Sequence, residues 1–167
     1  MTQVFVSIGS NIEREIHIRK ALTELEQAFG PLTVSSIYES EAEGFEGEPF
    51  YNLVIKFETD LAIEEVLKKL KEIETRHGRS VGSHKFAPRT LDLDLILYGD
   101  KILRNAKTGR MIVPRDDILR YAFVLQPLAE IAPDRLHPIE KKTFQALWKS
   151  FDPAKIRQKK ITLREQS

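Results

Sequence analysis

The chain contains no cysteine, one tryptophan and two methionines among its 167 residues. Without cysteine it forms no disulfide and no thiolate metal site, which is typical of proteins in a reducing compartment such as the cytoplasm. Neither sign of charge dominates, because 26 Lys and Arg residues face 25 Asp and Glu residues. A balanced surface of this kind does not favour a nucleic acid or a membrane as a partner. We therefore expect a cytoplasmic protein that binds neither.

Long apolar stretches are also missing. No run approaches the roughly 18–20 apolar residues of a transmembrane helix, and the apolar start at Val4–Val6 is too short for a signal peptide. The length predicts one domain over residues 1–167, and a hydrophobic fraction of 41% suffices for a sizeable core. Residues 153–167 form a basic tail that we interpret as solvated, with a nucleic-acid arm as the less favoured alternative. Nothing in the sequence demands more than a monomer.

Several motifs that bind nucleotides or metals are absent. The chain has no Gly-x-x-x-x-Gly-Lys-Ser/Thr and no Gly-x-Gly-x-x-Gly after a strand, which excludes a P-loop and leaves a Rossmann site unsupported. Its four histidines, His17, His77, His84 and His137, show no ligand spacing, so a zinc site is disfavoured. His17 is interpreted as a surface residue. The stretch Ile8–Asn11 predicts a turn into a helix, either as a simple capped turn, which we favour, or as an anion site.

Hydrophobic periodicity predicts the order strand, helix, strand, strand, helix, strand. The corresponding ranges are 4–8, 12–29, 32–38, 50–57, 63–78 and 91–98. A hairpin at 101–113 and short helices at 123–131 and 144–151 follow. This order is typical of an α+β, ferredoxin-like core, with a largely antiparallel sheet and its helices on one face. The last elements form a C-terminal hairpin and helical extension.

The last predicted core strand carries the most informative chemistry. Because side chains alternate along a strand, Asp92 and Asp94 point to one side and Leu91, Leu93 and Leu95 to the other. Two carboxylates about 6–7 Å apart on one face either lie solvated or pair with lysines, or they bind a hard cation such as Mg²⁺. Arg79, Lys85 and Arg89 precede them and favour a phosphate group bridged to the protein by Mg²⁺.

Two aromatic residues lie beside polar groups. Phe50 starts the strand that carries Asn52, and Phe123 starts a late helix. From the pattern alone these rings are most simply core residues. The alternative is that they enclose a flat heterocycle while the amide of Asn52 reads its edge.

The segment Pro88–Ile96 resembles the signature of the 6-hydroxymethyl-7,8-dihydropterin pyrophosphokinase family. Further matches extend over nearly the whole chain, at Ile8–Asn11, Phe50–Asn52, Gly78-Arg79, Val113-Pro114 and Phe123–Pro133. The resemblance implies transfer of pyrophosphate from ATP to the hydroxymethyl group of the pterin, with release of AMP, in folate biosynthesis. It also implies that two Mg²⁺ ions and ATP take part, and that the partners are small molecules.

Roles are carried over from the resemblance residue by residue. It implies that Asp92 and Asp94 bind both metal ions and that Arg79 and Arg89 act beside them in catalysis. The implied ATP-binding residues are Lys71, Glu74, Arg79, Lys85, Arg89, Leu95, Arg115, Arg120 and Tyr121. The implied pterin-binding residues are Ser40, Glu41, Ala42, Glu43, Phe50, Asn52, Asp92 and Phe123.

The chain departs from the family pattern in its loops. Ser40-Glu41 replaces a usual threonine-proline pair, and Val81, Gly82 and Phe86 replace basic residues and a tryptophan. Arg115 replaces a histidine, and Tyr121 replaces an arginine next to Arg120. These changes keep a second hypothesis open, a divergent paralogue that binds pterin or nucleotide with weak or altered activity. A third, a ferredoxin-like interaction module, leaves the cluster of Arg89, Asp92 and Asp94 unexplained.

Overall fold

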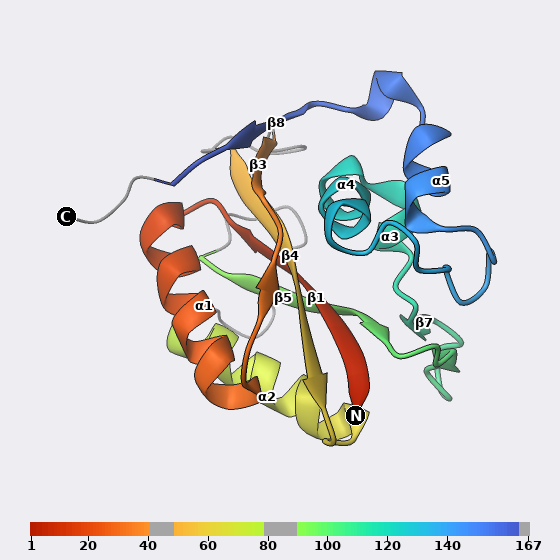
Figure 1. Cartoon of the computed structure of the whole chain (residues 1–167). Coiled ribbons are helices and arrows are strands. Elements are labelled where there is room, and N and C mark those ends of the chain that lie inside the picture. Colours follow the sequence, from red (N-terminus) through yellow and green to blue (C-terminus); the bar gives the residue numbers. More distant parts are fainter. Residues whose placement is uncertain (41–48, 79–89, 164–167) are drawn as a thin grey trace.

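The computed structural model describes residues 1–40, 49–78 and 90–163, and an antiparallel sheet lies at its centre (Figure 1). The sheet runs in the order β5-β1-β4-β3-β8, with β2 also paired to β4. Its strands are β1 (Thr2–Ser10), β2 (Thr33–Val34), β3 (Ile37–Ser40), β4 (Phe50–Thr59), β5 (Asp92–Tyr98) and β8 (Gln158–Ile161). A separate hairpin contains β6 (Leu103–Arg104) and β7 (Met111–Val113).

Helices cover both sides of this sheet (Figure 1). They are α1 (Arg14–Phe29), α2 (Ile63–Arg76), α3 (Asp117–Arg120), α4 (Ala122–Ile131) and α5 (Phe144–Lys149), followed by the 3-10 turn η1 (Pro153–Lys155). We call the side that packs on α1 and α2 the first face, and the side that packs on α4 the second face. The predicted ferredoxin-like core is confirmed, with α1 and α2 on one face, and the C-terminal extension supplies the cover of the other. In the described part of the chain no helix combines the length and apolarity needed to cross a membrane.

Strand β1 shows how the sequence builds both faces. Val4, Val6 and Ile8 are fully buried in the core with α1 and α2. Phe5, between them, is fully buried in a second core with α4 and β5. A strand that is covered on both sides becomes apolar at every position rather than at every second one, as Val4–Val6 are.

Strand β5 changes its pattern at a bulge. Val6 pairs with Leu95 and Phe5 with Leu97, so Ile96 is an extra residue between the two pairs. Such a bulge locally alters which side successive side chains face. It explains why Leu95 packs in the first-face core while Ile96 and Leu97 both pack in the second.

The predicted turn at Gly9-Ser10 is wrong. Both residues belong to β1, where Gly9 pairs with Asn52 and Ser10 with Tyr51. The helix begins only at Arg14, and Glu13, with a φ of 42°, occupies its N-cap. The buried residues of α1 are Ile18, Ala21 and Leu25, whereas Ile12 and Ile16 are exposed.

Two further expectations need correction. The strand predicted over 32–38 is divided into β2 and β3, with Ser35 donating its backbone N–H to Val54 between them. The C-terminal tail is not merely solvated, because Gln158–Ile161 pairs antiparallel with β3. Ile161 and Leu163 pack at the margin of the first-face core.

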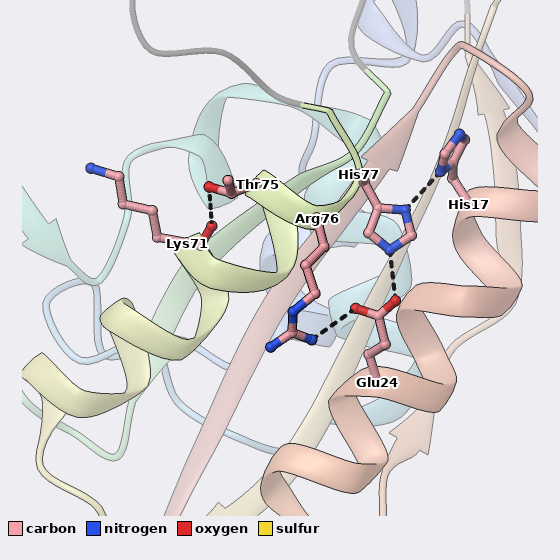
Figure 2. Close-up of polar contacts among 6 residues, drawn as sticks. All are labelled: His17, Glu24, Lys71, Thr75, Arg76 and His77. Atoms are coloured by element: carbon pink, nitrogen blue, oxygen red, sulfur yellow. Dashed lines mark hydrogen bonds and ion pairs between the residues drawn. The ribbon is translucent and has the colours of Figure 1, made fainter.

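A polar cluster connects the two helices of the first face (Figure 2). The Nδ1 atoms of His17 and His77 lie 2.7 Å apart, and His77 Nε2 lies 3.0 Å from an oxygen of Glu24. Arg76 pairs with the second oxygen of Glu24 at 3.3 Å. His17 is therefore not the plain surface residue predicted, since its side chain is only 17% exposed and bonds a residue sixty positions away. Local periodicity carries no information about such a contact.

A carboxylate connects α4 to the sheet on the second face. Glu130 accepts hydrogen bonds from the Tyr38 hydroxyl at 2.8 Å and from the Ser36 backbone N–H and hydroxyl at 3.0 and 2.8 Å. Burial raises the pKa of Glu130, but these donors outweigh it and hold the pKa below its ordinary value. Burial and then the Glu130 carboxylate raise the pKa of the Tyr38 hydroxyl. The bonds therefore join a protonated phenol to an ionised acid.

Candidate active site

A row of three residues crosses the second face of the sheet. Asp92 of β5 pairs with Gly9 of β1, and Gly9 pairs with Asn52 of β4. Residues directly opposite each other in antiparallel strands present their side chains on the same face. With neighbouring strands about 4.8 Å apart, Asp92 and Asn52 are separated by about 10 Å, and only a glycine lies between them.

Gly9 leaves space in the middle of this row. A Cβ atom at this position would lie 3.0 Å from Oδ1 of Asn52 and 3.7 Å from the ring of Phe50. A glycine inside a strand often marks a place where a ligand or another chain approaches the backbone closely. Here it allows the amide of Asn52 and the ring of Phe50 to reach over β1 toward Asp92.

The amide of Asn52 is held in one orientation. Its Nδ2 donates to the hydroxyl of Ser40 at 2.8 Å, and the two side chains are only 5% and 7% exposed. Oδ1 therefore points toward Gly9. A buried, oriented carbonyl oxygen of this kind can accept a hydrogen bond from the N–H edge of a flat heterocycle.

Asp94 lies one step along β5 from the row, opposite Ser7. Its carboxylate is 3.9 Å from Nη2 of Arg115, whose Nε is 3.3 Å from Asp117. Burial lowers the pKa of Arg115, but the carboxylates of Asp94 and Asp117 outweigh it and raise the pKa above its ordinary value. A backbone hydrogen bond of 3.0 Å from Arg115 to Ile96 keeps this cation beside β5.

The donor set of β5 suits a hard divalent cation. Asp92 and Asp94 lie on one face and are partly exposed, and the Asp94 side chain is 36% exposed. Among the described residues no group of three or more His, Cys, Asp or Glu side chains could hold a metal ion. Mg²⁺ is commonly bound by one or two carboxylates, with phosphate oxygens and waters completing the shell. Two carboxylates on an open face fit that arrangement.

The N-terminal end of α4 brings aromatic side chains to the second face. The rings of Tyr121 and Phe123 stack with centroids 4.9 Å apart, and both residues are partly exposed. Arg120 is exposed, with its guanidinium 5.5 Å from the Tyr121 ring. Phe123 contacts the margin of the second-face core. It is therefore neither fully buried nor free in solvent, as a wall of a ligand site should be.

The residues expected near the adenosine divide between surface and core. Lys71 is exposed on α2, and its side chain extends away from the histidine cluster (Figure 2). Glu74 reaches β5, where its carboxylate accepts the backbone N–H of Leu93 at 2.7 Å. Leu95 is 4% exposed and packs in the first-face core. Glu74 thus connects α2 to the strand that carries both aspartates.

Six of the predicted site residues lie outside the described residues. They are Glu41, Ala42, Glu43, Arg79, Lys85 and Arg89. Their expected roles toward the pterin and the phosphates stay predictions.

Comparison with known proteins identifies the chain's relatives. The family model described as 7,8-dihydro-6-hydroxymethylpterin-pyrophosphokinase (HPPK) matches residues 5–133. The chain belongs to this family. A protein of Aquifex aeolicus named 2-amino-4-hydroxy-6-hydroxymethyldihydropteridine pyrophosphokinase is 37% identical over 155 residues, which cover 92% of each chain. The folic acid synthesis protein fol1 of Pneumocystis carinii is also 37% identical over 139 residues, 81% of this chain but only 18% of that protein.

Solved structures confirm the fold of this HPPK chain. A crystal structure of Plasmodium falciparum HPPK-DHPS superposes with a TM-score of 0.75 at 14% identity, over 98% of this chain and 48% of that one. The chain therefore spans about half of that longer protein.

Sequence reasoning missed three residues in or beside the candidate site. Gly9 was assigned to a turn, although a glycine between strand-forming residues is itself a signal of close approach. Asp117 is half-buried two positions after Arg115, and nothing local indicates that the two side chains are in contact. Gln158 lies in β8, beyond the region that the family model matches.

Proposed function

We propose that this protein carries out the reaction of its family with the residues described above. It transfers the pyrophosphoryl group of ATP to the hydroxymethyl group of 6-hydroxymethyl-7,8-dihydropterin and releases AMP, a step in folate biosynthesis. The observation that carries the proposal is the row Asp92–Gly9–Asn52 in a chain of the HPPK family. It provides an amide for a heterocycle, a glycine beside it and a carboxylate pair within one face.

The pterin would lie over Gly9. Asn52 Oδ1 accepts a hydrogen bond from the ring edge, since the bond from Nδ2 to Ser40 turns Oδ1 toward Gly9. Phe50 and Phe123 contact the two sides of the ring. Losing either partner of the Asn52 amide, the Ser40 hydroxyl or the N–H edge of the ligand, is costly. A buried polar group without its hydrogen bond costs about 1–3 kcal/mol. Heterocycles that lack the N–H edge are therefore rejected.

The triphosphate of ATP would lie beside β5. Asp92 and Asp94 would hold Mg²⁺, which when bound neutralises the phosphate oxygens. Arg115 supplies a permanent positive charge next to Asp94. Lys71, Glu74, Leu95, Arg120 and Tyr121 are the further ATP-binding residues that we propose among the described residues.

The transfer itself is mainly a matter of alignment. The hydroxyl oxygen of the pterin attacks the β-phosphorus of ATP and loses its proton, which passes to water. The bond from that phosphorus to the oxygen of the α-phosphate breaks, and AMP leaves with the bond's electron pair. Because Asp92 shares a row with Asn52, it is the carboxylate nearest the pterin, and we assign the contact with the attacking hydroxyl to it. Phosphoryl-type transfers are accelerated chiefly by positioning and charge neutralisation.

One assay tests this function. The protein is incubated with ATP, Mg²⁺ and 6-hydroxymethyl-7,8-dihydropterin, and AMP is measured by chromatography. We expect AMP and the pyrophosphorylated pterin in equal amounts, and no AMP without the pterin. Binding of pterin in calorimetry without AMP formation would instead support the divergent paralogue. The metal assignment is tested separately: AMP formation should stop when EDTA is added and return when Mg²⁺ is supplied in excess.

The expectations of a monomer and of a cytoplasmic location also stay predictions. Light scattering of the purified protein decides the first, and fractionation of the source cells decides the second.

A further inference from the structure

The C-terminal strand β8 lies outside the part of the chain that the family model matches, which ends at residue 133. It nevertheless reaches the candidate pterin site. In its register Gln158 pairs with Ser40, and Ser40 pairs on its other side with Phe50. Gln158 therefore presents its side chain on the second face, next to the residues that orient Asn52.

The side chain of Gln158 crosses from β8 to the first turn of α4. Its Nε2 donates to the backbone oxygen of Ala122 at 3.0 Å and to Oε1 of Gln126 at 2.7 Å. An amide nitrogen has two hydrogens, so both donors are used. Ala122 directly precedes Phe123 in the chain. One side chain thus connects the strand edge at Ser40 with the helix end that carries Phe123.

These hydrogen bonds lie at the N-terminal end of α4. Glu130 connects α4 to Ser36 and Tyr38, but it lies at the opposite end of the helix, seven residues beyond Phe123. At the end where Phe123 is presented, Val124 and Leu125 pack in the second-face core. Gln158 adds hydrogen bonds from the edge of the sheet to this apolar packing.

We propose that Gln158 is a positioning residue that sets the distance between the Phe123 side and the Ser40–Asn52 side of the pterin site. The proposal rests on the proposed function for the identity of the ligand. Gln158 contacts no reacting atom, and it acts through Ala122 and Phe123. Its effect should fall on pterin recognition, and much less on ATP, whose proposed contacts lie on β5 and α2.

The sharpest variant is Gln158→Glu. It keeps the shape of the side chain but replaces two N–H donors by a carboxylate that faces two acceptor oxygens. Lys159→Ala is the matched control, because Lys159 lies on the same strand, points to the first face and has its ammonium 3.7 Å from Glu39. We expect KM for the pterin to rise about tenfold in Gln158→Glu, which corresponds to the loss of one to two hydrogen bonds. We expect kcat and KM for ATP to change less than about twofold, and all three to stay unchanged in Lys159→Ala.

A second measurement needs no substrate. With 4-fluorophenylalanine incorporated only at residue 123, the fluorine NMR signal reports the surroundings of that ring. We expect one sharp signal in the parent protein and in Lys159→Ala, and a shifted or broadened one in Gln158→Glu. An unchanged signal overturns the proposal, and so does an equal rise in KM for ATP and pterin, which would indicate general loosening. If the parent protein forms no AMP and binds no pterin, the proposed function fails, and the fluorine signal still decides the role of Gln158.

Discussion

The two faces of the sheet use the same strands for different purposes. On the first face, β1 contributes Val4, Val6 and Ile8, which are all fully buried beneath α1 and α2. On the second face the same strand changes from Phe5, buried beneath α4, to Ser7 and then to Gly9. One face is apolar along its whole length, and the other is apolar at one end and polar at the other.

This difference teaches where a small fold can place its chemistry. The first face supplies apolar burial that stabilises the fold, so the polar end of the second face does not have to be apolar. The polar contacts that hold the helices differ as well. Two imidazoles, a carboxylate and a guanidinium connect α1 to α2 and the residues at its end, whereas a carboxylate and a neutral amide connect α4 to the sheet.

The largest expected effect separates chemistry from stability on the second face. Asp94→Asn keeps the shape of the side chain but removes a carboxylate charge beside Arg115. We expect kcat to fall by about a thousandfold or more, since charge neutralisation dominates this type of transfer. The midpoint of urea unfolding should stay nearly unchanged. Asp100→Asn, an exposed change just beyond the other end of β5, serves as the control and should retain full activity. Full activity of Asp94→Asn would refute the metal assignment.

A matched pair of leucines compares the two cores directly. Leu25 on α1 is 0% exposed and Leu125 on α4 is 1% exposed. Replacing either by alanine should cost about 2–5 kcal/mol of unfolding free energy, because each leaves a cavity. Only Leu125→Ala should also raise KM for the pterin, by about threefold or more, since it loosens the helix turn that carries Phe123. Equal effects of both variants on KM would remove the functional difference between the faces.

The first face should respond to mild acid. Burial, and after it the neighbouring His77, lower the pKa of His17 below 6.5, while Glu13 opposes them and Lys20 adds to the decrease. The unfolded chain therefore binds more protons below pH 6.5, and the unfolding free energy falls as the pH drops from 6.5. The slope contributed by one such histidine is at most about 1.4 kcal/mol per pH unit. Urea unfolding between pH 7.5 and 5 measures it.

Substitution separates this response from that of a second histidine. His137 accepts two backbone N–H groups at Nδ1, and burial lowers its pKa, with Glu140 opposing. His17→Asn retains an amide that can contact His77 but cannot titrate. In that variant we expect the unfolding free energy to change less steeply with pH. The part of the pH dependence that comes from His137 should remain. A slope identical to that of the parent protein would show that the imidazole pair does not carry this response.

The smallest expected effect concerns the carboxylate of the second face. Because the pKa of Glu130 is lowered in the folded protein, its stabilisation is present above pH 4.5 and is lost as the pH falls through the folded value. Glu130 is exposed, so Glu130→Gln should cost less than about 1 kcal/mol at neutral pH. It should also flatten the stability curve below pH 4.5. A loss that persists unchanged at pH 3.5 would assign the effect to packing instead of charge.

The sequence predicted the parts of this protein that depend on local pattern. The alternation in Asp92–Leu95 predicted which side chains share a face, and the register of β5 with β1 confirms it. The apolar spacing of α2 predicts a buried face of five residues, Ile63, Val66, Leu67, Leu70 and Ile73. Four of them are buried, whereas Leu67 is 38% exposed. In both places the period of the element decides burial.

The missed features depend on which strands become neighbours. Gly9 acquires its role only when β4 brings Asn52 beside it. Gln158 does so only when β8 returns to β3, more than one hundred residues after it. The contact of His17 with His77 needs α1 and α2 to pack together. Single-sequence periodicity reports the face of an element and not its partner.

Strand β8 also has a consequence for the solubility of the chain. It is the outermost strand beside β3, whose Ile37 and Tyr38 are largely buried. An uncovered strand of that kind offers unpaired backbone groups to another molecule and promotes aggregation. β8 is only four residues long and carries Lys159 and Lys160 in its centre, both exposed. The molecule therefore ends its sheet with a short, charged strand that discourages a second copy from adding to it.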